Sequence, residues 1–250
     1  PYTTLFRSPK PWAAAPRLRG FGEGTSPSVC RRYSHGVDFP ILSSLPEGER
    51  LRVIASGRPR RFSRREVIVH EGQPSDSFHL VQSGRLAVRV ATPDGLNAML
   101  NVLSPGDYFG EISLVDMSVR HRRTATVVAL EDSSTLSYSD ADFRRLRDEH
   151  PQLERVLIAA LAQRVDELST MLLQALYEPL GERVVRRLAT LASVYRGVAA
   201  SGEAVTIPLT QESLAEFVGG TRPSVNQVLQ RLQREGVLTI GRGRVVVDPR

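Results

Sequence analysis

Short apolar runs and turn residues alternate between residues 62 and 138, which distinguishes this stretch from the rest of the chain. The runs are rich in Val, Ile, Leu and Thr, and glycines recur every 11 or 12 residues, at positions 72, 84, 95 and 106. This repeat is typical of strands and turns in an antiparallel sandwich or barrel. The dipeptides Asp94-Gly95 and Ser83-Gly84 each predict a hairpin turn. We therefore expect an antiparallel β-roll.

A long helical pattern follows the predicted roll. From Pro151 to Tyr177 there is no glycine and no internal proline, and apolar residues recur at intervals of three and four. The positions of this apolar seam are Ile158, Leu161, Val165, Leu168, Leu172 and Ala175. At 1.5 Å per residue the helix is about 40 Å long, which is more than a small roll can cover. A dimer seam is therefore favoured over the alternative, a helix packed on its own domain.

The C-terminal residues predict a winged helix-turn-helix. The residues Glu-Pro-Leu-Gly at 178–181 interrupt the long helix and are interpreted as a hinge. The expected elements that follow are a helix over 182–195, a short helix after Thr210, a helix from Thr221 to Glu235, and a hairpin through Gly241-Arg242-Gly243. Helix, turn, helix and hairpin in this order are typical of winged helix-turn-helix domains.

Two segments precede the roll. Residues 1–37 are rich in Pro, Gly, Ser and Arg without periodicity, which predicts a disordered leader. The next segment has short helical spacing, with Leu45, Leu51 and Ile54 as the expected packing residues. The sequence thus predicts an α+β protein, and its expected parts are a leader over 1–37, a β-roll over 38–150, a long dimerisation helix over 151–178 and a winged helix-turn-helix over 179–250.

Composition narrows the classes of function. The 250 residues contain no apolar run of about 18 residues and no apolar signal-peptide core, so we expect a cytoplasmic protein without a membrane segment. The single cysteine, Cys30, excludes an internal disulfide and a cysteine-held zinc or iron–sulfur site. The five histidines lack ligand spacing, and motifs of hydrolytic or nucleotide-cleaving sites do not occur. We therefore expect no metal site, no required cofactor and no enzyme activity.

Positive charge is concentrated towards the ends of the chain. The net charge is +6, and residues 181–250 carry 10 arginines against 6 acidic residues. A basic C-terminal domain indicates a polyanionic partner. The alternative is a solvated surface of the same charge.

Two motifs resemble those of a known family. Residues 105–127, PGDYFGEISLVDMSVRHRRTATV, are similar to the phosphate-binding cassette of cyclic nucleotide domains. Residues 209–238, LTQESLAEFVGGTRPSVNQVLQRLQREGVL, are similar to the helix-turn-helix of Crp/Fnr (catabolite activator protein) transcriptional regulators. The resemblance covers about residues 38–250. It implies a jelly-roll sensor that binds a cyclic nucleotide, cAMP first and cGMP second, in a homodimer that binds double-stranded DNA and RNA polymerase.

The first motif contains the groups that a cyclic phosphate needs. A guanidinium presents paired N–H groups at phosphate geometry, so we expect Arg123 to bind the phosphate and Thr124 to add a hydroxyl donor. Glu111 can accept a ribose hydroxyl proton, and Gly110 allows close approach of the backbone. The alternative is a salt bridge between Glu111 and Arg123 in a pocket without ligand. The remaining expected contacts are Ile112 and Ala125.

The resemblance also places ligand contacts on the long helix. In cAMP-binding members, two adjacent hydroxyls of this helix contact adenine across the dimer, and the corresponding residues here are Leu168 and Ser169. One hydroxyl is therefore missing, which argues against adenine-specific recognition. Leu168 is alternatively a residue of the apolar seam alone.

The second motif predicts the DNA contacts. Thr221 is the expected N-cap of the recognition helix, and Pro223 fits its first turn. The expected inward-facing residues are Val225, Leu229 and Leu232. Arg222 matches the family's guanine-reading arginine, whereas Pro223 and Gln227 differ from the family, so the operator half-site does not carry over. The expected DNA contacts are Thr210, Gln211, Thr221, Arg222, Ser224, Asn226, Gln227, Arg242 and Arg244.

These observations predict a ligand-gated transcription regulator. Two alternatives stay open. One is a family member that binds DNA with another effector or with none, and the other is a cyclic nucleotide sensor for a partner enzyme.

Overall fold

A computed structural model of the chain describes residues 37–91, 95, 97–114, 122–196 and 203–248. The predicted leader lies outside the described residues except for Val37, and so does Cys30. Residues from Val37 onward belong to one unit, and the following description concerns that unit.

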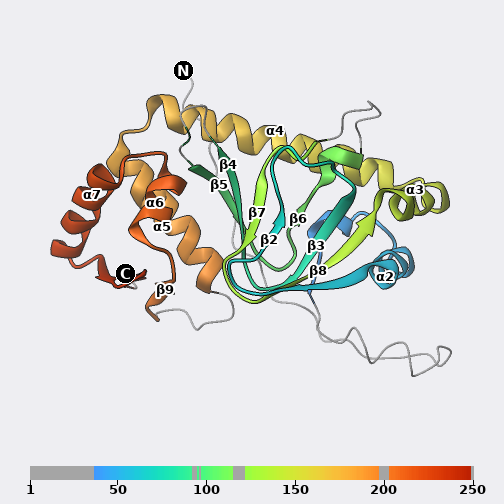
Figure 1. Cartoon of the computed structure of the whole chain (residues 1–250), viewed down its shortest axis with the longest axis horizontal. Helices are drawn as coiled ribbons and strands as arrows, with labels where there is room; N and C mark the ends of the chain where they lie inside the picture. Colours follow the sequence, from blue (N-terminus) through green and yellow to red (C-terminus); the bar gives the residue numbers. More distant parts are fainter. Residues whose placement is uncertain (1–36, 92–94, 96, 115–121, 197–202, 249–250) are drawn as a thin grey trace, which may run out of the picture. The chain divides into compact units, whose positions relative to one another are not determined.

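Two four-stranded antiparallel sheets form the N-terminal domain (Figure 1). The first sheet has the order β1 (Arg58–Phe62), β8 (Ser133–Ser139), β3 (Ser77–Ser83) and β6 (Tyr108–Phe109). The second has the order β2 (Val67–Val69), β7 (Thr126–Ala129), β4 (Leu86–Ala91) and β5 (Asn97–Leu103). Side chains between the sheets form an apolar core that includes the fully buried Val81 and Leu86. The predicted β-roll is confirmed.

One of the two predicted hairpins is confirmed and the other is wrong. Strands β4 and β5 pair in antiparallel register from Leu86 opposite Leu103, so the chain does reverse between them, although Asp94 lies outside the described residues. Strand β3 instead pairs with β8 and β6, so the turn at Gly84 carries the chain from one sheet to the other. Gly84 has φ +77°, and a Cβ there would lie 2.6 Å from the carbonyl oxygen of Asp132. Close approach between two chain segments therefore requires this glycine.

Short helices cover one end of the roll. They are the 3-10 helix η1 (Pro40–Leu42), α2 (Glu47–Ser56) and α3 (Asp140–Glu149). Leu45 is buried and Ile54 is half-buried as predicted, but Leu51 is 58% exposed, which makes that prediction wrong. The buried residue of α2 is Val53. Leu51 and Val53 are two positions apart on the helix and therefore point to nearly opposite faces, so only one of them can face the roll.

The long helix α4 (Leu153–Tyr177) runs past the roll (Figure 1). Its apolar side chains lie on two different faces. Its first two turns pack on the roll through Leu153, Val156, Leu157 and Ala160. The predicted seam lies on another face, and Ile158, Val165 and Leu172 are 67%, 64% and 59% exposed. Ala175 is also exposed, while Leu161 is half-buried. The buried apolar contacts of the helix with its own domain therefore lie near its start, and its own domain does not bury most of the seam.

The C-terminal head, residues 180–248, has the predicted winged helix-turn-helix order. Its helices are α5 (Leu180–Arg196), α6 (Gln211–Val218) and α7 (Arg222–Arg234). Its sheet has the order β10 (Leu238–Gly241), β11 (Arg244–Val247) and β9 (Val205–Ile207), so the terminal hairpin is confirmed. Strand β9 was not predicted, because three residues are too few to show a periodic pattern. Helix α5 begins two residues before the predicted start, which leaves only residues 178–179 as the interruption after α4.

One apolar cluster fills the head. Leu191, Leu214 and Leu229, one from each helix, are 0–1% exposed within it. Ala87 and Met99 of the neighbouring strands β4 and β5 belong to the same cluster. Among the described residues, none of the helices combines the length and apolar character that crossing a membrane requires.

Candidate functional site

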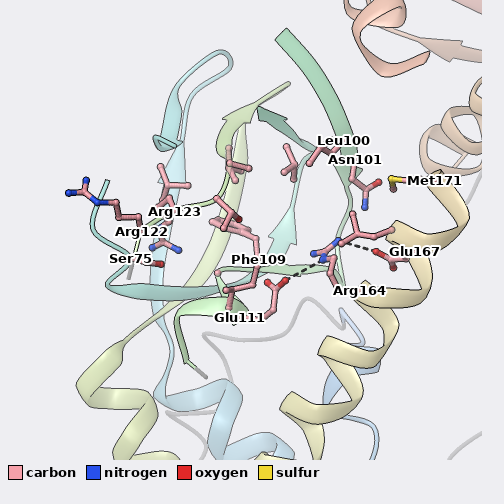
Figure 2. Close-up of a pocket in the computed structure, with 18 residues that line it drawn as sticks. Ser75, Leu100, Asn101, Phe109, Glu111, Arg122, Arg123, Arg164, Glu167 and Met171 are labelled. Carbon is pink, nitrogen blue, oxygen red and sulfur yellow. Dashed lines mark hydrogen bonds and ion pairs between the residues drawn. The ribbon is translucent and has the colours of Figure 1, made fainter. Parts of the chain in front are cut away.

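A cavity of about 360 Å³ lies between the roll and helix α4 (Figure 2). Its walls come from strands of the second sheet, from the segment 109–112, from the segment 122–125 and from α4. The predicted ligand residues that line it are Gly110, Glu111, Ile112, Arg123, Thr124 and Ala125. The fold thus brings together both ends of the predicted phosphate cassette, although residues 115–121 between them lie outside the described residues.

Arg123 is the buried cation of the cavity, with a side chain that is 5% exposed. Its Nη2 donates to Ser77 Oγ at 2.8 Å and lies 3.4 Å from Oδ1 of the exposed Asp76. Its Nε and Nη1 are buried and have no hydrogen-bond partner among the described residues. Burial lowers the pKa of Arg123, and the nearby Asp76 partly offsets this effect. Buried donors without acceptors are costly, so this arrangement fits an anionic ligand.

Gly110 keeps the space beside this guanidinium open. It has φ +86°, a conformation that favours glycine. A Cβ at this position would lie 2.5 Å from the carbonyl oxygen of Ser77 and 2.7 Å from Nη1 of Arg123. Any larger residue would therefore displace the guanidinium or the neighbouring strand.

Glu111 forms its ion pair with a different arginine from the one considered in the sequence. Arg164 of α4 donates from Nε to Glu111 Oε1 at 3.2 Å and from Nη1 to Glu167 Oε2 at 3.0 Å. The described residues form no salt bridge between Glu111 and Arg123, so this part of the alternative is wrong, whereas a pocket without ligand stays an alternative. Burial opposes the charge on Arg164, but the two carboxylates outweigh it and raise the pKa of Arg164 above its ordinary value.

Sequence reasoning missed Arg164. Its only sequence signal is its position one helical turn before Leu168, on the same side of the helix. Arg164 is 53 positions away from Glu111 in the chain, so no local pattern joins it to the cassette. Leu168 lines the cavity together with Glu167 and Met171.

Neither Arg122 nor the predicted contact Ser169 is placed as Arg123 is. The guanidinium of Arg122 donates to the carbonyl oxygen of Gly72 at 2.6 Å and is exposed, and Figure 2 shows it directed away from the cavity. Ser169 does not line the cavity, and its hydroxyl donates to the carbonyl oxygen of Val165 within the same helix. A ligand contact of Ser169 across a dimer stays a prediction.

The described part of the chain contains no group of three or more His, Cys, Asp or Glu residues placed to hold a metal ion. Its buried histidine beside the cavity, His79, is surrounded by hydroxyl groups and by the ring of Phe109.

The second site is the surface of helices α6 and α7 in the head. Each helix begins at a threonine that accepts a hydrogen bond from the backbone N–H three residues later, Thr210 from Ser213 and Thr221 from Ser224. Pro223 lies in the first turn of α7. The predicted inward-facing residues Val225, Leu229 and Leu232 are all buried. The predicted cap Thr221 and the predicted inner face of the recognition helix are confirmed.

Burial divides the predicted DNA contacts into two groups. The exposed ones are Thr210, Thr221, Arg222, Gln227, Arg242 and Arg244. Gln211, Ser224 and Asn226 are half-buried, and the amide oxygen of Asn226 is shielded from solvent. The exposed arginines and Gln227 are therefore better placed to meet DNA than Asn226 is.

Comparisons with known proteins found matches for the two domains that contain these sites. A family model of the cyclic nucleotide-binding domain matches residues 59–150, and one of the Crp-like helix-turn-helix domain matches residues 182–250. The CRP-like cAMP-activated global transcriptional regulator of Mycobacterium tuberculosis is 26% identical over 76% of this chain and 84% of its own. The cyclic AMP receptor protein of Thermus thermophilus is 28% identical over 83% of this chain and 92% of its own length.

The fold has a counterpart among solved structures. The c-di-GMP responsive global regulator CLP of Xanthomonas campestris matches with a TM-score of 0.70 and 20% identity, over 82% of this chain and 100% of that one. At this identity the likeness shows the fold alone.

Proposed function

Because the chain belongs to the Crp/Fnr family of transcriptional regulators, we propose that it binds cAMP in the β-roll and thereby controls its binding, as a homodimer, to a palindromic DNA operator. The observation that carries this proposal is the buried guanidinium of Arg123, whose Nε and Nη1 have no acceptor among the described residues. A cyclic phosphate supplies the missing acceptors and a compensating negative charge.

The rest of the cavity suits the other parts of a nucleotide. The Glu111 carboxylate is an acceptor for a ribose hydroxyl, and its ion pair with Arg164 balances its charge. Val88, Leu100, Val127 and Met171 supply apolar surface for a base. The volume of about 360 Å³ is at the lower end for small-molecule sites, which favours a mononucleotide over a dinucleotide such as c-di-GMP.

Two relatives named for cAMP support cAMP as the first candidate effector. The Leu168 side chain, where cAMP-binding members of the family are expected to have a hydroxyl, makes cGMP the second candidate. A relative of the same fold that is named for c-di-GMP makes this dinucleotide a necessary comparison in any binding experiment.

Helix α4 offers a route from the ligand to DNA. Arg164 and Leu168 border the cavity, while Val165 and Leu172 belong to the exposed seam of the same helix. Ligand binding therefore changes the surroundings of the residues that we expect to form the dimer contact. In a dimer, the arrangement of the two α4 helices sets the distance between the two α7 helices, which must be about 34 Å to enter successive major grooves. A ligand with unequal affinity for two such arrangements shifts their populations.

Calorimetric titration tests the effector. The full chain is titrated with cAMP, cGMP and c-di-GMP, first alone and then with DNA fragments selected from a random library. We expect cAMP to bind with the highest affinity and to increase the affinity for the selected DNA, because the two binding events are coupled. Tight DNA binding that no nucleotide changes would instead identify a family member without a nucleotide effector. Nucleotide binding without any DNA binding would identify a sensor module for another protein. We expect RNA polymerase to join the DNA complex, which a mobility-shift assay with the polymerase tests.

A further inference from the structure

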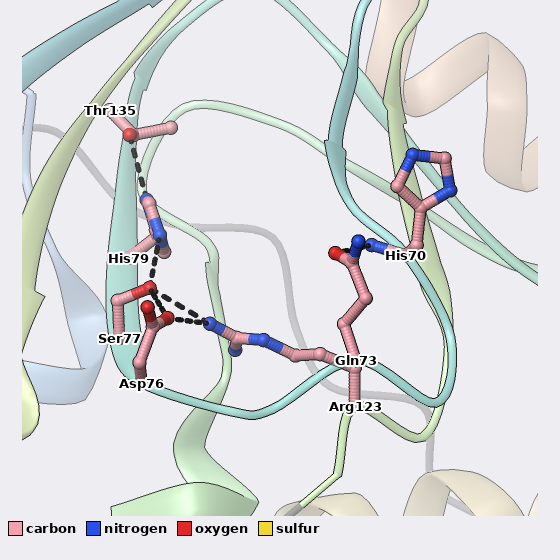
Figure 3. A network of polar contacts seen from close by, with 7 residues as sticks. All are labelled: His70, Gln73, Asp76, Ser77, His79, Arg123 and Thr135. Atoms are coloured by element: carbon pink, nitrogen blue, oxygen red, sulfur yellow. Dashed lines mark hydrogen bonds and ion pairs between the residues drawn. The ribbon is translucent and has the colours of Figure 1, made fainter.

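The buried ring of His79 lies next to Ser77, and Ser77 contacts the guanidinium of Arg123 (Figure 3). His79 belongs to β3, which pairs with β8 on one side and β6 on the other. Its ring stacks on Phe109 with a centroid distance of 4.6 Å and an angle of 4° between the rings. Nδ1 lies 3.0 Å from the hydroxyl oxygen of Thr135, and Nε2 lies 3.1 Å from the hydroxyl oxygen of Ser77. Both ring nitrogens are therefore engaged, and the ring plane is held by the stack.

Ser77 connects this ring to the cavity. Its Oγ accepts a hydrogen bond from Nη2 of Arg123 at 2.8 Å and lies 3.1 Å from the ring nitrogen of His79. The same oxygen lies 3.0 Å from Oδ1 of Asp76, which is exposed. The hydrogen bonds thus run from Thr135 through His79 and Ser77 to Arg123, from the middle of a sheet to the ligand site (Figure 3).

The contacts with Ser77 and Asp76 leave two nitrogens of the guanidinium without a partner among the described residues. They engage only Nη2, while Nη1 and Nε keep no acceptor among the described residues. An arginine side chain has several rotatable bonds, so a fixed partner is needed to hold its fork in one orientation before ligand binds. A carboxylate in the place of His79 would instead attract the guanidinium as a competing anion.

We propose that His79 is a positioning residue for the nucleotide phosphate, which acts through Ser77 to hold the Arg123 guanidinium in its binding orientation. This inference rests on the proposed nucleotide site and adds a buried residue that does not touch the cavity. Burial, followed by the nearby Arg123 and Arg60, lowers the pKa of His79 to about 3, so the ring is uncharged at neutral pH. An uncharged ring holds Ser77 without repelling the arginine.

The test compares nucleotide affinities of the full chain by calorimetry, with the nucleotide that binds the wild type most tightly. His79→Phe keeps an aromatic ring for the stack on Phe109 and removes both ring nitrogens. Ser77→Ala breaks the next contact in the chain. We expect each variant to bind about 2- to 10-fold more weakly, the effect of removing one hydrogen bond. The double variant should bind no more than slightly worse than either single one, because both changes break the same chain of contacts.

A second measurement separates positioning from general damage. The two phosphorothioate diastereomers of the same cyclic nucleotide differ only in which exocyclic phosphate oxygen is replaced by sulfur. A fixed guanidinium distinguishes them, so we expect the ratio of their affinities to move towards one in His79→Phe. His79→Gln, which retains polar side-chain atoms, should restore part of the discrimination. The matched control is His150→Phe, at another buried histidine, which pairs with Glu49 and does not line the cavity.

The outcomes distinguish this inference from the proposed function. If Arg123→Ala weakens binding but His79→Phe leaves both affinity and discrimination unchanged, the positioning role is wrong and the site stands. If the loss of affinity in the double variant equals the product of the two single losses, the positioning role is also wrong. If the wild type binds no nucleotide, or Arg123→Ala has no effect, the proposed site fails and the role of His79 fails with it.

Discussion

The cavity beside α4 and the C-terminal head place their polar groups in opposite ways. In the cavity, the charged groups are buried, and Arg123 and Glu111 are 6% and 3% exposed. In the head, Arg222 and Arg244 are exposed on a surface whose interior is apolar. The cavity gathers residues that are 53 positions apart, such as Glu111 and Arg164, whereas the groups on α7 are neighbours along one helix.

This difference has a physical reason. A small anion is held by a few donors in a site that excludes water, where each hydrogen bond is strengthened and every unpaired donor is costly. A DNA duplex is large and strongly charged, so a solvated surface binds it through many contacts, each of which is weakened by salt. Substitutions in the cavity should therefore change ligand affinity through single contacts, and substitutions in the head should act on base preference or on salt dependence.

We expect the largest effect from substitutions in the apolar seam of α4, which should weaken DNA binding by the head much more than ligand binding in the cavity. Replacing Leu161 and Leu172 together with Asp places carboxylates on the expected dimer contact and should convert the protein to a monomer. Operator affinity should fall by about 100-fold or more, because one head per molecule loses the second half-site. Nucleotide binding should persist in weakened form, since Arg123, Glu111 and Arg164 line the cavity from within the same chain and only the expected contact of Ser169 across the dimer is lost. Sedimentation, DNA anisotropy and calorimetry measure these three properties.

The control for the seam is Thr170→Asp, which adds one carboxylate to the same helix at an exposed position off the seam. It should remain dimeric. A wild type that sediments as a monomer at micromolar concentration contradicts the dimer interpretation.

The next effect is confined to the cavity. Arg123→Ala removes the buried donors and should weaken nucleotide binding by roughly 10- to 150-fold, the range for hydrogen bonds to a charged group. Arg122→Ala should change little, because its guanidinium is exposed and contacts the carbonyl oxygen of Gly72. DNA affinity without nucleotide should be the same in both variants. Equal losses of nucleotide affinity in the two variants contradict the assignment of Arg123.

In the head, Arg222 and Arg244 are expected to contribute to DNA binding in different ways, one to base preference and the other to salt dependence. Arg222→Ala should cost about 1 to 3 kcal/mol on the selected operator and relax the preference at one base position in each half-site. Arg244→Ala should weaken binding to all sequences and reduce the salt slope by about one unit for each phosphate that is no longer neutralised. Selection from a randomised library and a salt titration measure these effects. A uniform loss for Arg222→Ala would make Gln227, the exposed neighbour on α7, the next residue to test.

The smallest effect concerns pH and stability. Burial and the nearby Arg123 and Arg60 lower the pKa of His79 from 6.5 to about 3. Above pH 6.5 the ring is neutral in both the folded and the unfolded chain, and below it the unfolded chain takes up the proton first. The wild type should therefore lose up to about 1.4 kcal/mol of unfolding free energy per pH unit relative to His79→Phe as pH falls from 6.5. Urea unfolding of both proteins between about pH 7.5 and 4.5 measures the difference, and parallel pH profiles contradict a neutral buried ring.

Local patterns predicted those parts of the molecule that depend on neighbouring residues. The cap Thr221 and the inner face of α7 follow from residue type and helical spacing, and the structure confirms them. The predictions that failed concern residues whose surroundings are set by segments far away in the sequence. The turn at Ser83-Gly84 joins two sheets because β8 and β6 already occupy the edges of β3. Leu51 was predicted to be buried, but the face of α2 that meets the roll contains Val53.

The sequence by itself determined the order of roll, long helix and winged helix-turn-helix, because hydrophobic periodicity depends only on the chain. A motif resemblance also predicted Arg123 and Glu111 as ligand residues, and the structure places both in the wall of one cavity. Only the tertiary structure decided their partners, Ser77 for Arg123 and Arg164 for Glu111. These contacts join β3 to the segment after residue 121 and α4 to the segment after β6. The physical reason is that a hydrogen bond requires a donor and an acceptor within about 3 Å of each other, and residues far apart in sequence reach that distance only in the folded chain.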